Sequence, residues 1–481
     1  MDDLTMTVNG SAVPVAAFFD VINPATGTVF AQAPACGREQ LDNAMNAAQA
    51  AYRTWKSDDK ARRAILHDLA DALEAASDRL APILTAEQGK PLTDSRLEVE
   101  FGAVWLRYYA NLEIPREIVQ DDARGFAEVV RRPMGVVAAI TPWNFPISLA
   151  MWKIAPALRA GNTMVLKPSP FTPLTTLALG EVWRDVLPPG VLNVVTGPDP
   201  LGAWMATHPT PRKISFTGST ATGKKVAAAA AEDLKRVTLE LGGNDPAIVL
   251  DDADPDEIAD GLFWGAFGNN GQICLAVKRI YVHERRHDDL LAALAARAEA
   301  VQVGDGMDPG VLLGPINNRP QFDRVSELVQ DALAHGGVAV AGGKPLDRPG
   351  YFFAPTIITD VDDGVRIVDE EQFGPALPIV SYRDLDDVVE RANAGDYGLT
   401  ASVWSPDLDR AADVASRLDC GQVSVNVHGG AAAPELPFGG HKWSGIGVEN
   451  GPWGLHGFTE LQALARPARL GRKVVGDVTG S

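Results

Sequence analysis

The sequence predicts an α/β fold made of at least two packed units. The chain has 481 residues, of which 46% are hydrophobic. A single hydrophobic core stops growing at about 250–300 residues, so a chain of this length is expected to divide. After Gly135, short apolar runs alternate with helical patterns. Such alternation is typical of a parallel sheet that is covered by helices.

The elements can be placed in order along the chain. Apolar residues recur at spacings of three and four from Leu41 to Trp55, as in an amphipathic helix, and the run from Ile65 to Leu73 begins a second helix. Five apolar runs are then expected to be strands of the sheet: residues 136–140, 163–166, 191–195, 213–216 and 237–239.

Between the second and third of these strands, a helix is expected. Thr172 would cap it, Pro173 would be its first residue, and it would end before Pro188. A second α/β unit is expected after Gly242, where residues 247–250 predict a strand and residues 258–267 predict a helix.

The composition excludes some partners and indicates a cytoplasmic protein. The formal net charge of −19 repels nucleic acid and anionic membrane surfaces. Only Cys36, Cys274 and Cys420 occur, too few for a disulfide framework. The N-terminus lacks a basic region followed by an apolar run, and no stretch is apolar for the length of a membrane span. The histidines show no metal-ligand spacing, so no metal is expected.

Three ordered motifs include one of the cysteines. Cys274 ends the run Gly-Asn-Asn-Gly-Gln-Ile-Cys, Glu240 lies earlier in Leu-Glu-Leu-Gly-Gly, and Glu371 opens the later run Glu-Gln-Phe-Gly-Pro. A lone cysteine is more often a buried, inert residue, and an isolated glutamate at a strand end is more often solvated. A nucleophilic cysteine needs a positive or proton-accepting environment. A carboxylate beside two glycines, which let the backbone turn closely around a ligand, is hard to explain as packing.

With four further motifs, the chain resembles the aldehyde dehydrogenase superfamily over nearly its whole length. These motifs are Thr-Pro-Trp-Asn at 141–144, Leu-Lys-Pro-Ser at 166–169, Phe-Thr-Gly-Ser at 216–219 and Pro-Phe-Gly-Gly-His-Lys-Trp-Ser-Gly at 437–445. The resemblance implies three parts: a Rossmann-type cofactor domain of residues 1–115 and 134–242, an α/β catalytic domain of residues 243–445, and a small β oligomerisation element of residues 116–133 and 456–470. It also implies a homodimer or homotetramer.

The resemblance further implies oxidation of an aldehyde to a carboxylic acid, through a thiohemiacetal and a thioester on Cys274. Glu240 would activate the water that hydrolyses the thioester. Asn144 and the backbone N–H of Cys274 would form the oxyanion hole, since an amide donates without titrating, although Asn144 could also be a simple turn residue. Two alternatives are a CoA-acylating semialdehyde dehydrogenase, which typically lacks this glutamate, and a catalytically silent structural protein on the same fold.

The resemblance implies NAD or NADP as the cofactor, but the sequence motif that would bind it is harder to recognise. No Gly-x-Gly-x-x-Gly follows the first strand, and the nearest substitute is the turn at 218–223, which leads into a helix whose N-terminus can hold a phosphate. The resemblance implies this cofactor-binding set: Ile140, Thr141, Pro142, Trp143, Lys167, Ser169, Pro170, Gly218, Ser219, Gly223, Leu241, Gly242, Glu371 and Phe373.

Pro170 leaves the choice between the two cofactors open. By resemblance, Lys167 and Ser169 contact the adenosine ribose, and many NAD-preferring relatives continue this motif with a glutamate that holds both ribose hydroxyls. This chain has Pro170 instead. A proline side chain accepts no hydrogen bond and brings no charge that would repel a 2′-phosphate.

The residues expected around the substrate indicate an apolar aldehyde. By resemblance, they are Phe145, Trp152, Ile273, Leu275, His428 and Phe438. Relatives that act on succinic semialdehyde commonly have an arginine where this chain has Trp152, so a distal carboxylate lacks an evident partner. The alternative is that some of these side chains do not contact substrate but belong to the ordinary core, and this applies to His428 in particular.

Overall fold

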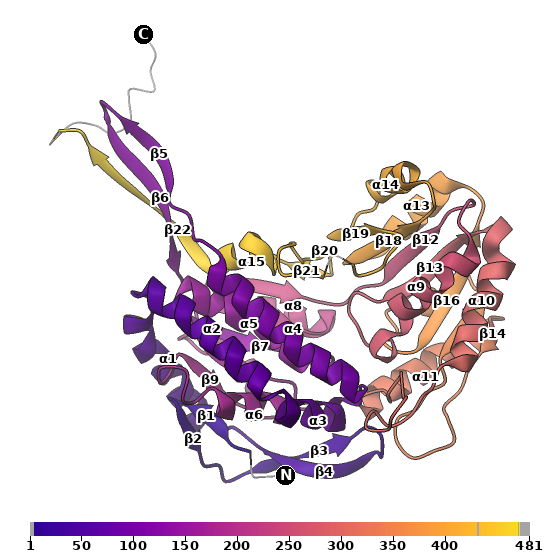
Figure 1. Ribbon diagram of the computed structural model, residues 1–481, viewed down its shortest axis with the longest axis horizontal. Helices are drawn as coiled ribbons and strands as arrows, with labels where there is room; N and C mark the ends of the chain where they lie inside the picture. Colours follow the sequence, from indigo (N-terminus) through magenta and orange to yellow (C-terminus); the bar gives the residue numbers. More distant parts are fainter. Residues whose placement is uncertain (1–3, 431, 470, 472–481) are drawn as a thin grey trace.

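The computed structural model describes residues 4–430, 432–469 and 471, and the larger part of its strands belongs to two sheets (Figure 1). Within the described residues, the first sheet has eight strands, in the order β2 (Ser11–Val13), β1 (Met6–Val8), β9 (Leu192–Val194), β8 (Thr163–Lys167), β7 (Val136–Ile140), β10 (Lys213–Thr217), β11 (Arg236–Glu240) and β21 (Gly445–Ile446). The strands from β9 to β11 run parallel, which confirms the expected parallel α/β core.

The order of these strands creates a gap at one end of the sheet. From β7 the chain moves outward through β8 and β9, and it then returns to the other side of β7 as β10. Connections that diverge in this way leave a crevice at the carboxyl ends of the two strands, where ligands bind in open α/β sheets. Residues 141–144 follow β7 and residues 218–219 follow β10, so both motifs lie at this crevice.

The second sheet belongs to the later half of the chain. Among the described residues it has seven strands, in the order β14 (Val338–Ala341), β15 (Thr356–Thr359), β16 (Ala376–Tyr382), β13 (Val277–His283), β12 (Asp245–Val249), β18 (Thr400–Trp404) and β19 (Gln422–Val425). Its neighbouring strands are parallel, apart from β14 at one edge. Two shorter ladders join β3 (Phe18–Asn23) to β4 (Thr28–Pro34) and β17 (Tyr397–Gly398) to β20 (His441–Lys442).

Three antiparallel strands form an arm that projects from the body of the molecule (Figure 1). They are β22 (Thr459–Pro467), β6 (Gly125–Pro133) and β5 (Glu117–Asp122). The last two strands occupy the insertion expected at 116–133. The C-terminal strand of the expected oligomerisation element, β22, starts at Thr459 and not at residue 456, because α15 (Gly451–His456) occupies the preceding residues.

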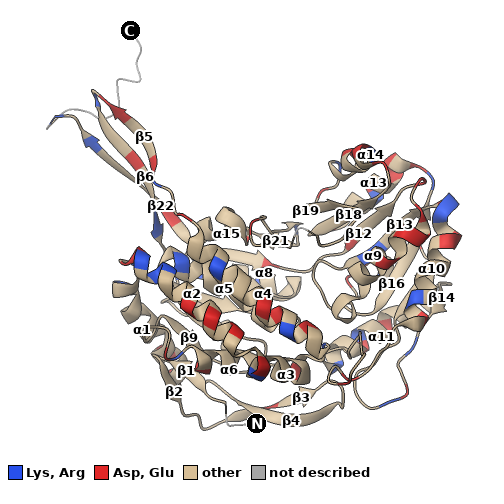
Figure 2. Cartoon of the chain, viewed as in Figure 1, with Lys and Arg blue, Asp and Glu red and all other residues tan. Residues whose placement is uncertain are grey.

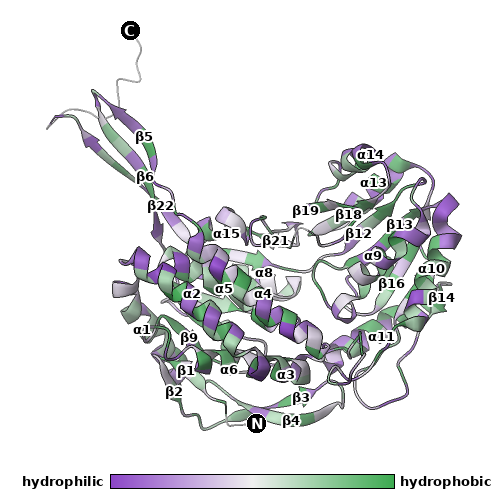
Figure 3. Ribbon diagram, viewed as in Figure 1, coloured by the Kyte–Doolittle hydropathy of each residue, from purple (hydrophilic) through white to green (hydrophobic). Residues whose placement is uncertain are grey.

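Helices pack on both sheets, and the strands between them are the more hydrophobic elements (Figure 3). The helices are α1 (Arg38–Trp55), α2 (Asp59–Ala75), α3 (Ser77–Gln88), α4 (Leu92–Asn111), α5 (Pro146–Ala160), α6 (Leu174–Val182), α7 (Leu201–Thr207), α8 (Thr220–Glu232), α9 (Pro255–Phe267), α10 (His287–Ala300), α11 (Arg319–Ala334), α12 (Arg366–Asp369), α13 (Leu385–Asn393) and α14 (Leu408–Ala415). Acidic and basic residues both occur along α2 and α4 on the outside of the body (Figure 2). No helix in the described part of the chain is both long and apolar enough to cross a membrane.

Helix α6 begins one residue later than the sequence predicts, and Thr172 does not cap it. The hydroxyl of Thr172 has no hydrogen-bond partner among the described residues. Instead, the carboxylate of Glu87 accepts hydrogen bonds from the backbone N–H groups of Leu174 at 2.7 Å and Thr175 at 2.9 Å. A negative charge from a distant part of the chain therefore replaces the local cap at this helix N-terminus.

Candidate active site

Segments that are far apart in the sequence meet at the carboxyl end of the first sheet. Asn144, in the turn after β7, donates a hydrogen bond to the loop that precedes Cys274. Gly243, just after β11, is packed so closely against the carbonyl of Cys274 that a Cβ would lie 2.9 Å from it. Glu371 accepts a hydrogen bond from the backbone N–H of the same glycine at 3.1 Å. The structure therefore brings the predicted motifs together.

Cys274 follows a tightly wound loop. The short 3-10 turn at Gly268–Gly271 contains Asn269 at a φ of 48° and Asn270 at a φ of 59°. This left-handed region is open mainly to glycine and asparagine. Gly271 follows at a φ of 72°, in a place where a Cβ would collide with a neighbouring carbonyl. Backbone geometry therefore favours the Asn-Asn-Gly part of the motif, and it fixes where the thiol emerges.

The half-buried thiol of Cys274 is uncharged at neutral pH. Burial raises its pKa to about 12. The positive charge of Lys278 opposes this rise, whereas the negative charges of Asp245, Glu371 and Glu240 add to it. A thiol with such a high pKa becomes a nucleophile only when a nearby base removes its proton.

Asn144 is held through both its side chain and its backbone. It is 2% exposed, and its Nδ2 donates to the carbonyl of Gln272 at 2.9 Å. Its own carbonyl accepts hydrogen bonds from Lys90 Nζ at 2.9 Å and from Asn269 Nδ2 at 3.1 Å. The amide donor of Asn144 is therefore fixed against the loop that carries Cys274.

Glu240 is a buried carboxyl group that keeps its lone pairs free. It is 3% exposed, and neither of its carboxyl oxygens has a hydrogen-bond partner among the described residues. Burial and the negative charge of Glu449 raise the pKa of Glu240 well above its usual value, while Lys153 opposes the rise. A carboxylate with a raised pKa and free lone pairs is suited to accept a proton near neutral pH.

The two charged neighbours of Glu240 form a buried ion pair that the sequence did not reveal. Lys153 Nζ lies 2.6 Å from Glu449 Oε1, and their side chains are 0% and 1% exposed. Lys153 also donates to Thr217 Oγ1 at 2.7 Å, and Ser215 donates to the same glutamate oxygen at 3.3 Å. Because Lys153 and Glu449 are separated by 296 positions, no local pattern in the sequence links them.

A cavity of about 1200 Å³ opens at the crevice of the first sheet. Many of the residues predicted to bind the cofactor line it: Ile140, Thr141, Pro142, Trp143, Lys167, Ser169, Pro170, Gly218 and Ser219. Asn317, Asn318, Arg319 and Tyr351 line it as well, and the sequence analysis missed them. They come from the later half of the chain and belong to no recognised motif, so only the folded structure places them here.

The cavity is suited to an anionic ligand at the start of α8. Ser219 is the N-cap of this helix, and its hydroxyl accepts a hydrogen bond from the N–H of Thr222 at 3.3 Å. The N–H groups of a first helical turn, together with the helix dipole, favour a phosphate. Lys167 adds an amine at the same cavity, and burial lowers the pKa of this lysine to about 8.

The remaining predicted cofactor residues do not line this cavity but pack around the active site. Phe373 meets the ring of Trp143 edge to face, with 5.3 Å between the ring centroids. A Cβ on Gly223 would collide with the side chain of Leu241, and a Cβ on Gly242 would collide with the carboxylate of Glu371. Only glycine at 223 and 242 leaves room for the side chains of Leu241 and Glu371 to pack this closely against the backbone.

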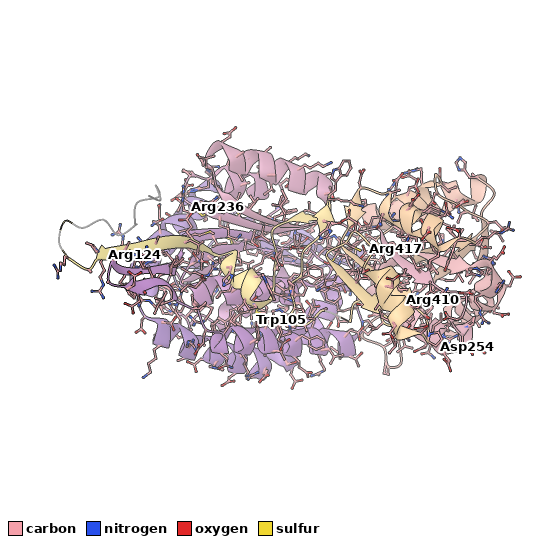
Figure 4. The ribbon with its side chains drawn as sticks, turned by 90° about the horizontal axis from the view of Figure 1, so that it is seen from above. Trp105, Arg124, Arg236, Asp254, Arg410 and Arg417 are labelled. Carbon is pink, nitrogen blue, oxygen red and sulfur yellow. The ribbon has the colours of Figure 1, made fainter. Side chains whose placement is uncertain are left out.

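The predicted substrate residues include an aromatic cluster. Trp152 stacks on Trp105 with 5.7 Å between ring centroids, and it meets Phe438 edge to face at 5.0 Å. Trp105, which the sequence analysis missed, donates from its indole nitrogen to Asn450 at 2.8 Å. Figure 4 shows Trp105 beside α15, the helix that follows this asparagine.

The other predicted substrate residues flank the thiol or its neighbours. Ile273 and Leu275 are half-buried on either side of Cys274. The ring of Phe145 lies 3.7 Å from Lys90 Nζ.

His428 supports the Cys274 loop. Its Nε2 lies 2.7 Å from the carbonyl of Leu275, and its Nδ1 lies 2.9 Å from the hydroxyl of Ser402. Burial lowers the pKa of His428 to about 4, so the ring is neutral and both of its nitrogens are engaged within the protein.

Comparison with known proteins agrees with this geometry. Residues 13–464 match the sequence model of the aldehyde dehydrogenase family. The chain is 40% identical to phenylacetaldehyde dehydrogenase of Pseudomonas fluorescens, over 92% of each chain, and 39% identical to succinate-semialdehyde dehydrogenase [NADP(+)] of Escherichia coli strain K12, over 95% and 94%. The NAD+ complex of an aldehyde dehydrogenase from Bacillus cereus superposes with a TM-score of 0.95 at 35% identity, over 97% of each chain. The chain therefore belongs to the aldehyde dehydrogenase family and is an NAD(P)-dependent oxidoreductase that acts on aldehydes.

Proposed function

We propose that the chain oxidises an apolar aldehyde to its carboxylic acid through a covalent thioester on Cys274, with Asn144 and Glu240 as the other catalytic residues. The observation that carries this proposal is the convergence of three buried or half-buried groups. The thiol of Cys274 needs a base, and the carboxyl group of Glu240 has no hydrogen-bond partner among the described residues. The side-chain amide of Asn144 is fixed against the loop that precedes Cys274.

In the first half of the reaction, Cys274 loses its proton and its sulfur adds to the aldehyde carbon. Glu240 is the group placed to accept that proton, because its pKa is raised and its lone pairs are free. The negative charge that develops on the former carbonyl oxygen is stabilised by the N–H of Cys274 and by Asn144 Nδ2. In the present structure one N–H of this amide donates to the carbonyl of Gln272, so its second N–H is the donor available to the oxyanion.

In the second half, water hydrolyses the thioester. Glu240 accepts a proton from the water as its oxygen adds to the acyl carbon. The carbon–sulfur bond then breaks, which releases the carboxylic acid and regenerates the thiolate of Cys274. Before this step, Glu240 must release to solvent the proton that it took from Cys274, because only the ionised carboxylate can accept a proton from water. The proton taken from water can then return to the thiolate and restore the thiol.

The residues at the 1200 Å³ cavity fit NAD or NADP. The start of α8 would hold the pyrophosphate, while Lys167 and Ser169 would contact the adenosine ribose. When bound, the nicotinamide would accept the hydride that leaves the former aldehyde carbon, and loss of this hydride converts the thiohemiacetal on Cys274 into the thioester. Pro170 lines the cavity and offers neither an acceptor for the ribose hydroxyls nor a charge against a 2′-phosphate, so we propose that both cofactors bind.

Several assignments complete the proposal. The first sheet with residues 1–115 and 134–242 would be the cofactor domain, residues 243–445 the catalytic domain, and residues 116–133 with 456–470 the oligomerisation element, although residue 470 lies outside the described part. The arm would join copies into a homodimer or homotetramer, because three apolar side chains on it are more than 60% exposed: Ile118 at 63%, Val119 at 68% and Leu461 at 64%. We also propose a cytoplasmic location, in which the thiol of Cys274 stays reduced.

Two alternatives are less well supported by the site. A CoA-acylating enzyme does not need a base that activates water, because CoA takes the acyl group. Here Glu240 is buried and, within the described part of the chain, both of its carboxyl oxygens are free to accept a proton. A silent structural protein has no need of a buried carboxyl group without a partner, because such a group destabilises the fold.

The test is an assay of the purified protein with aliphatic, aromatic and acidic aldehydes, each with NAD and with NADP. Reduced cofactor is followed by its absorbance, and the carboxylic acid is identified by mass spectrometry. We expect aldehyde-dependent reduction and one acid formed per cofactor reduced. No reduction with any aldehyde and either cofactor would contradict the proposal, and an acyl-CoA product that requires added CoA would favour the first alternative.

A further inference from the structure

Lys90 and Glu98 form a buried ion pair that touches the residue proposed to hold the oxyanion. Lys90 Nζ lies 2.5 Å from Glu98 Oε2, and each side chain is 1% exposed. Neither residue belongs to a motif that the proposed function uses. A fully buried ion pair is not a general means of stabilising a fold, because desolvation offsets much of the attraction between the charges. The contacts of Lys90 and Glu98 give a reason why the pair is buried at this place.

The ion pair holds the turn at Asn144 from two sides. Lys90 Nζ donates to the backbone carbonyl of Asn144 at 2.9 Å. Glu98 Oε1 accepts hydrogen bonds from the backbone N–H groups of Ile147 at 2.8 Å and Ser148 at 3.2 Å, at the start of α5. The carbonyl before the helix and the first N–H groups within it are thus bound to two side chains that are themselves bound to each other.

Lys90 is itself held rigidly. The preceding Gly89 ends α3 at a φ of 102°, where a Cβ would lie 2.8 Å from the ring of Pro315. Gln88 accepts a hydrogen bond from the N–H of Lys90 at 2.8 Å, and its backbone carbonyl accepts one from Asn317 Nδ2 at 3.2 Å. These contacts fix the backbone from which the Lys90 side chain starts, and the ammonium group itself is held by Glu98 and by the Asn144 carbonyl.

We propose that Lys90, paired with Glu98, is a positioning residue that fixes the backbone of Asn144 and thereby aims its side-chain amide at the oxyanion. The proposal rests on the proposed function. A side-chain donor works only when it is preorganised at the place where charge develops, and a displacement of about 1 Å can cost about 10²-fold in rate. Lys90 supplies this preorganisation through one carbonyl oxygen, whose other donor is Asn269 Nδ2 at 3.1 Å.

The test is a double-mutant cycle on the burst of reduced cofactor, measured by rapid mixing of the full-length enzyme at saturating cofactor. The variant is K90M/E98Q, because it removes both charges together and the glutamine oxygen still accepts from Ile147. We expect it to slow the burst by about 10²-fold, with an unchanged dissociation constant for the cofactor. In an N144A background, the same pair of changes should slow the burst by less than about threefold, because the donor that it aims is gone.

A matched control separates positioning from loss of stability. Arg159 is a buried cation near the C-terminal end of α5, about 18 Å along the helix from Ile147 at about 1.5 Å per residue, and its Nη1 lies 2.5 Å from Asp59. R159M should lower Tm yet leave the burst unchanged. Equal slowing by K90M/E98Q in both backgrounds, or slowing by R159M to the same extent, would overturn the role of Lys90.

Two further outcomes are decisive. If K90M/E98Q does not fold, K90R keeps a cation beside Glu98 but changes the geometry of the donor to the Asn144 carbonyl, and slowing of the burst that is equal in the N144A background would overturn positioning through that carbonyl. If the wild-type enzyme reduces no cofactor with any aldehyde, the proposed function itself fails, and the role of Lys90 falls with it.

Discussion

Glu449 lies close enough to Glu240 for its charge to raise the pKa of Glu240, yet only Glu449 is bound to a cation. Lys153 neutralises Glu449 at 2.6 Å, while the carboxyl oxygens of Glu240 have no partner among the described residues. The pKa of Glu240, the proposed base, is therefore set by the charges of this ion pair as well as by burial.

This relationship predicts a shift in the pH dependence of thioester hydrolysis. Glu240 must be ionised to act as a base, so hydrolysis should rise with pH through its raised pKa. In E449Q the charge that raises this pKa is lost and Lys153 is left unpaired, so the rising limb should move to lower pH. Breaking the pair should also destabilise the fold by about 3–5 kcal/mol. The measurement is the decay of the acyl-enzyme at each pH, with E460Q, a half-exposed carboxylate on the arm, as the control; an unmoved limb would show that Glu449 does not act on Glu240.

The three cysteines should differ in function although burial raises the pKa of each thiol to about 12. Only Cys274 has both the positive charge of Lys278 and the proposed base among its charged neighbours. C274A should therefore lower turnover by at least about 10⁴-fold, the scale on which loss of a covalent nucleophile acts, while cofactor binding measured by fluorescence stays intact. C36A and C420A should remain active. Near-normal turnover of C274A would remove the thioester from the mechanism.

Pro170 predicts how cofactor preference can be changed. P170E adds an acceptor for ribose hydroxyls and a charge that opposes a 2′-phosphate, so the ratio of kcat/KM for NAD to that for NADP should rise by about 10-fold to 100-fold, as a charged hydrogen bond is worth about 1.5–3 kcal/mol. P170Q supplies the acceptor without the charge and should give a smaller rise. A ratio that is unchanged or moves toward NADP would show that residue 170 does not face the ribose.

The aromatic cluster predicts a preference among aldehydes. Trp152 is packed between Trp105 and Phe438, and the neighbouring Lys153 is engaged by Glu449, so Lys153 is not free to pair with a distal carboxylate. Burying an unpaired carboxylate is costly. Phenylacetaldehyde and aliphatic aldehydes should therefore exceed succinic semialdehyde in kcat/KM by about 10²-fold or more, since each factor of ten needs only about 1.4 kcal/mol. If succinic semialdehyde proves the best substrate of the panel, another cation must reach the substrate.

The parts of the fold that depend on local pattern could be predicted from the sequence. Residues 136–140 form the strand expected from an apolar run, and the predicted helix from Leu41 to Trp55 begins only three residues earlier, at Arg38. In contrast, the start of α6 was misplaced because its cap comes from Glu87, 87 positions before Leu174. A local rule for helix caps cannot find a carboxylate that only the tertiary fold brings near.

The site divides in the same way. Motifs containing Cys274, Glu240 and Asn144 are visible in the sequence, and the structure brings them together. In contrast, Lys90 contacts Asn144 and Glu449 contacts Lys153 across long stretches of the chain, and neither residue occupies a position that any pattern distinguishes. Buried charges of this kind are recognised only from their partners in the folded protein.

The most direct test of the account is rapid mixing of E240Q with aldehyde and cofactor, followed by mass spectrometry of the intact protein. The amide keeps the shape of the carboxylate but cannot accept a proton from water. The account predicts a burst of reduced cofactor of at most one equivalent per active site, very slow turnover afterwards, and an acyl group retained on Cys274. Because Glu240 is also proposed to take the proton of the thiol, the burst itself should be slower than in the wild type and should recover partly at high pH, as the thiol ionises unaided. Full steady-state turnover of E240Q without an acyl group on Cys274 would contradict the account.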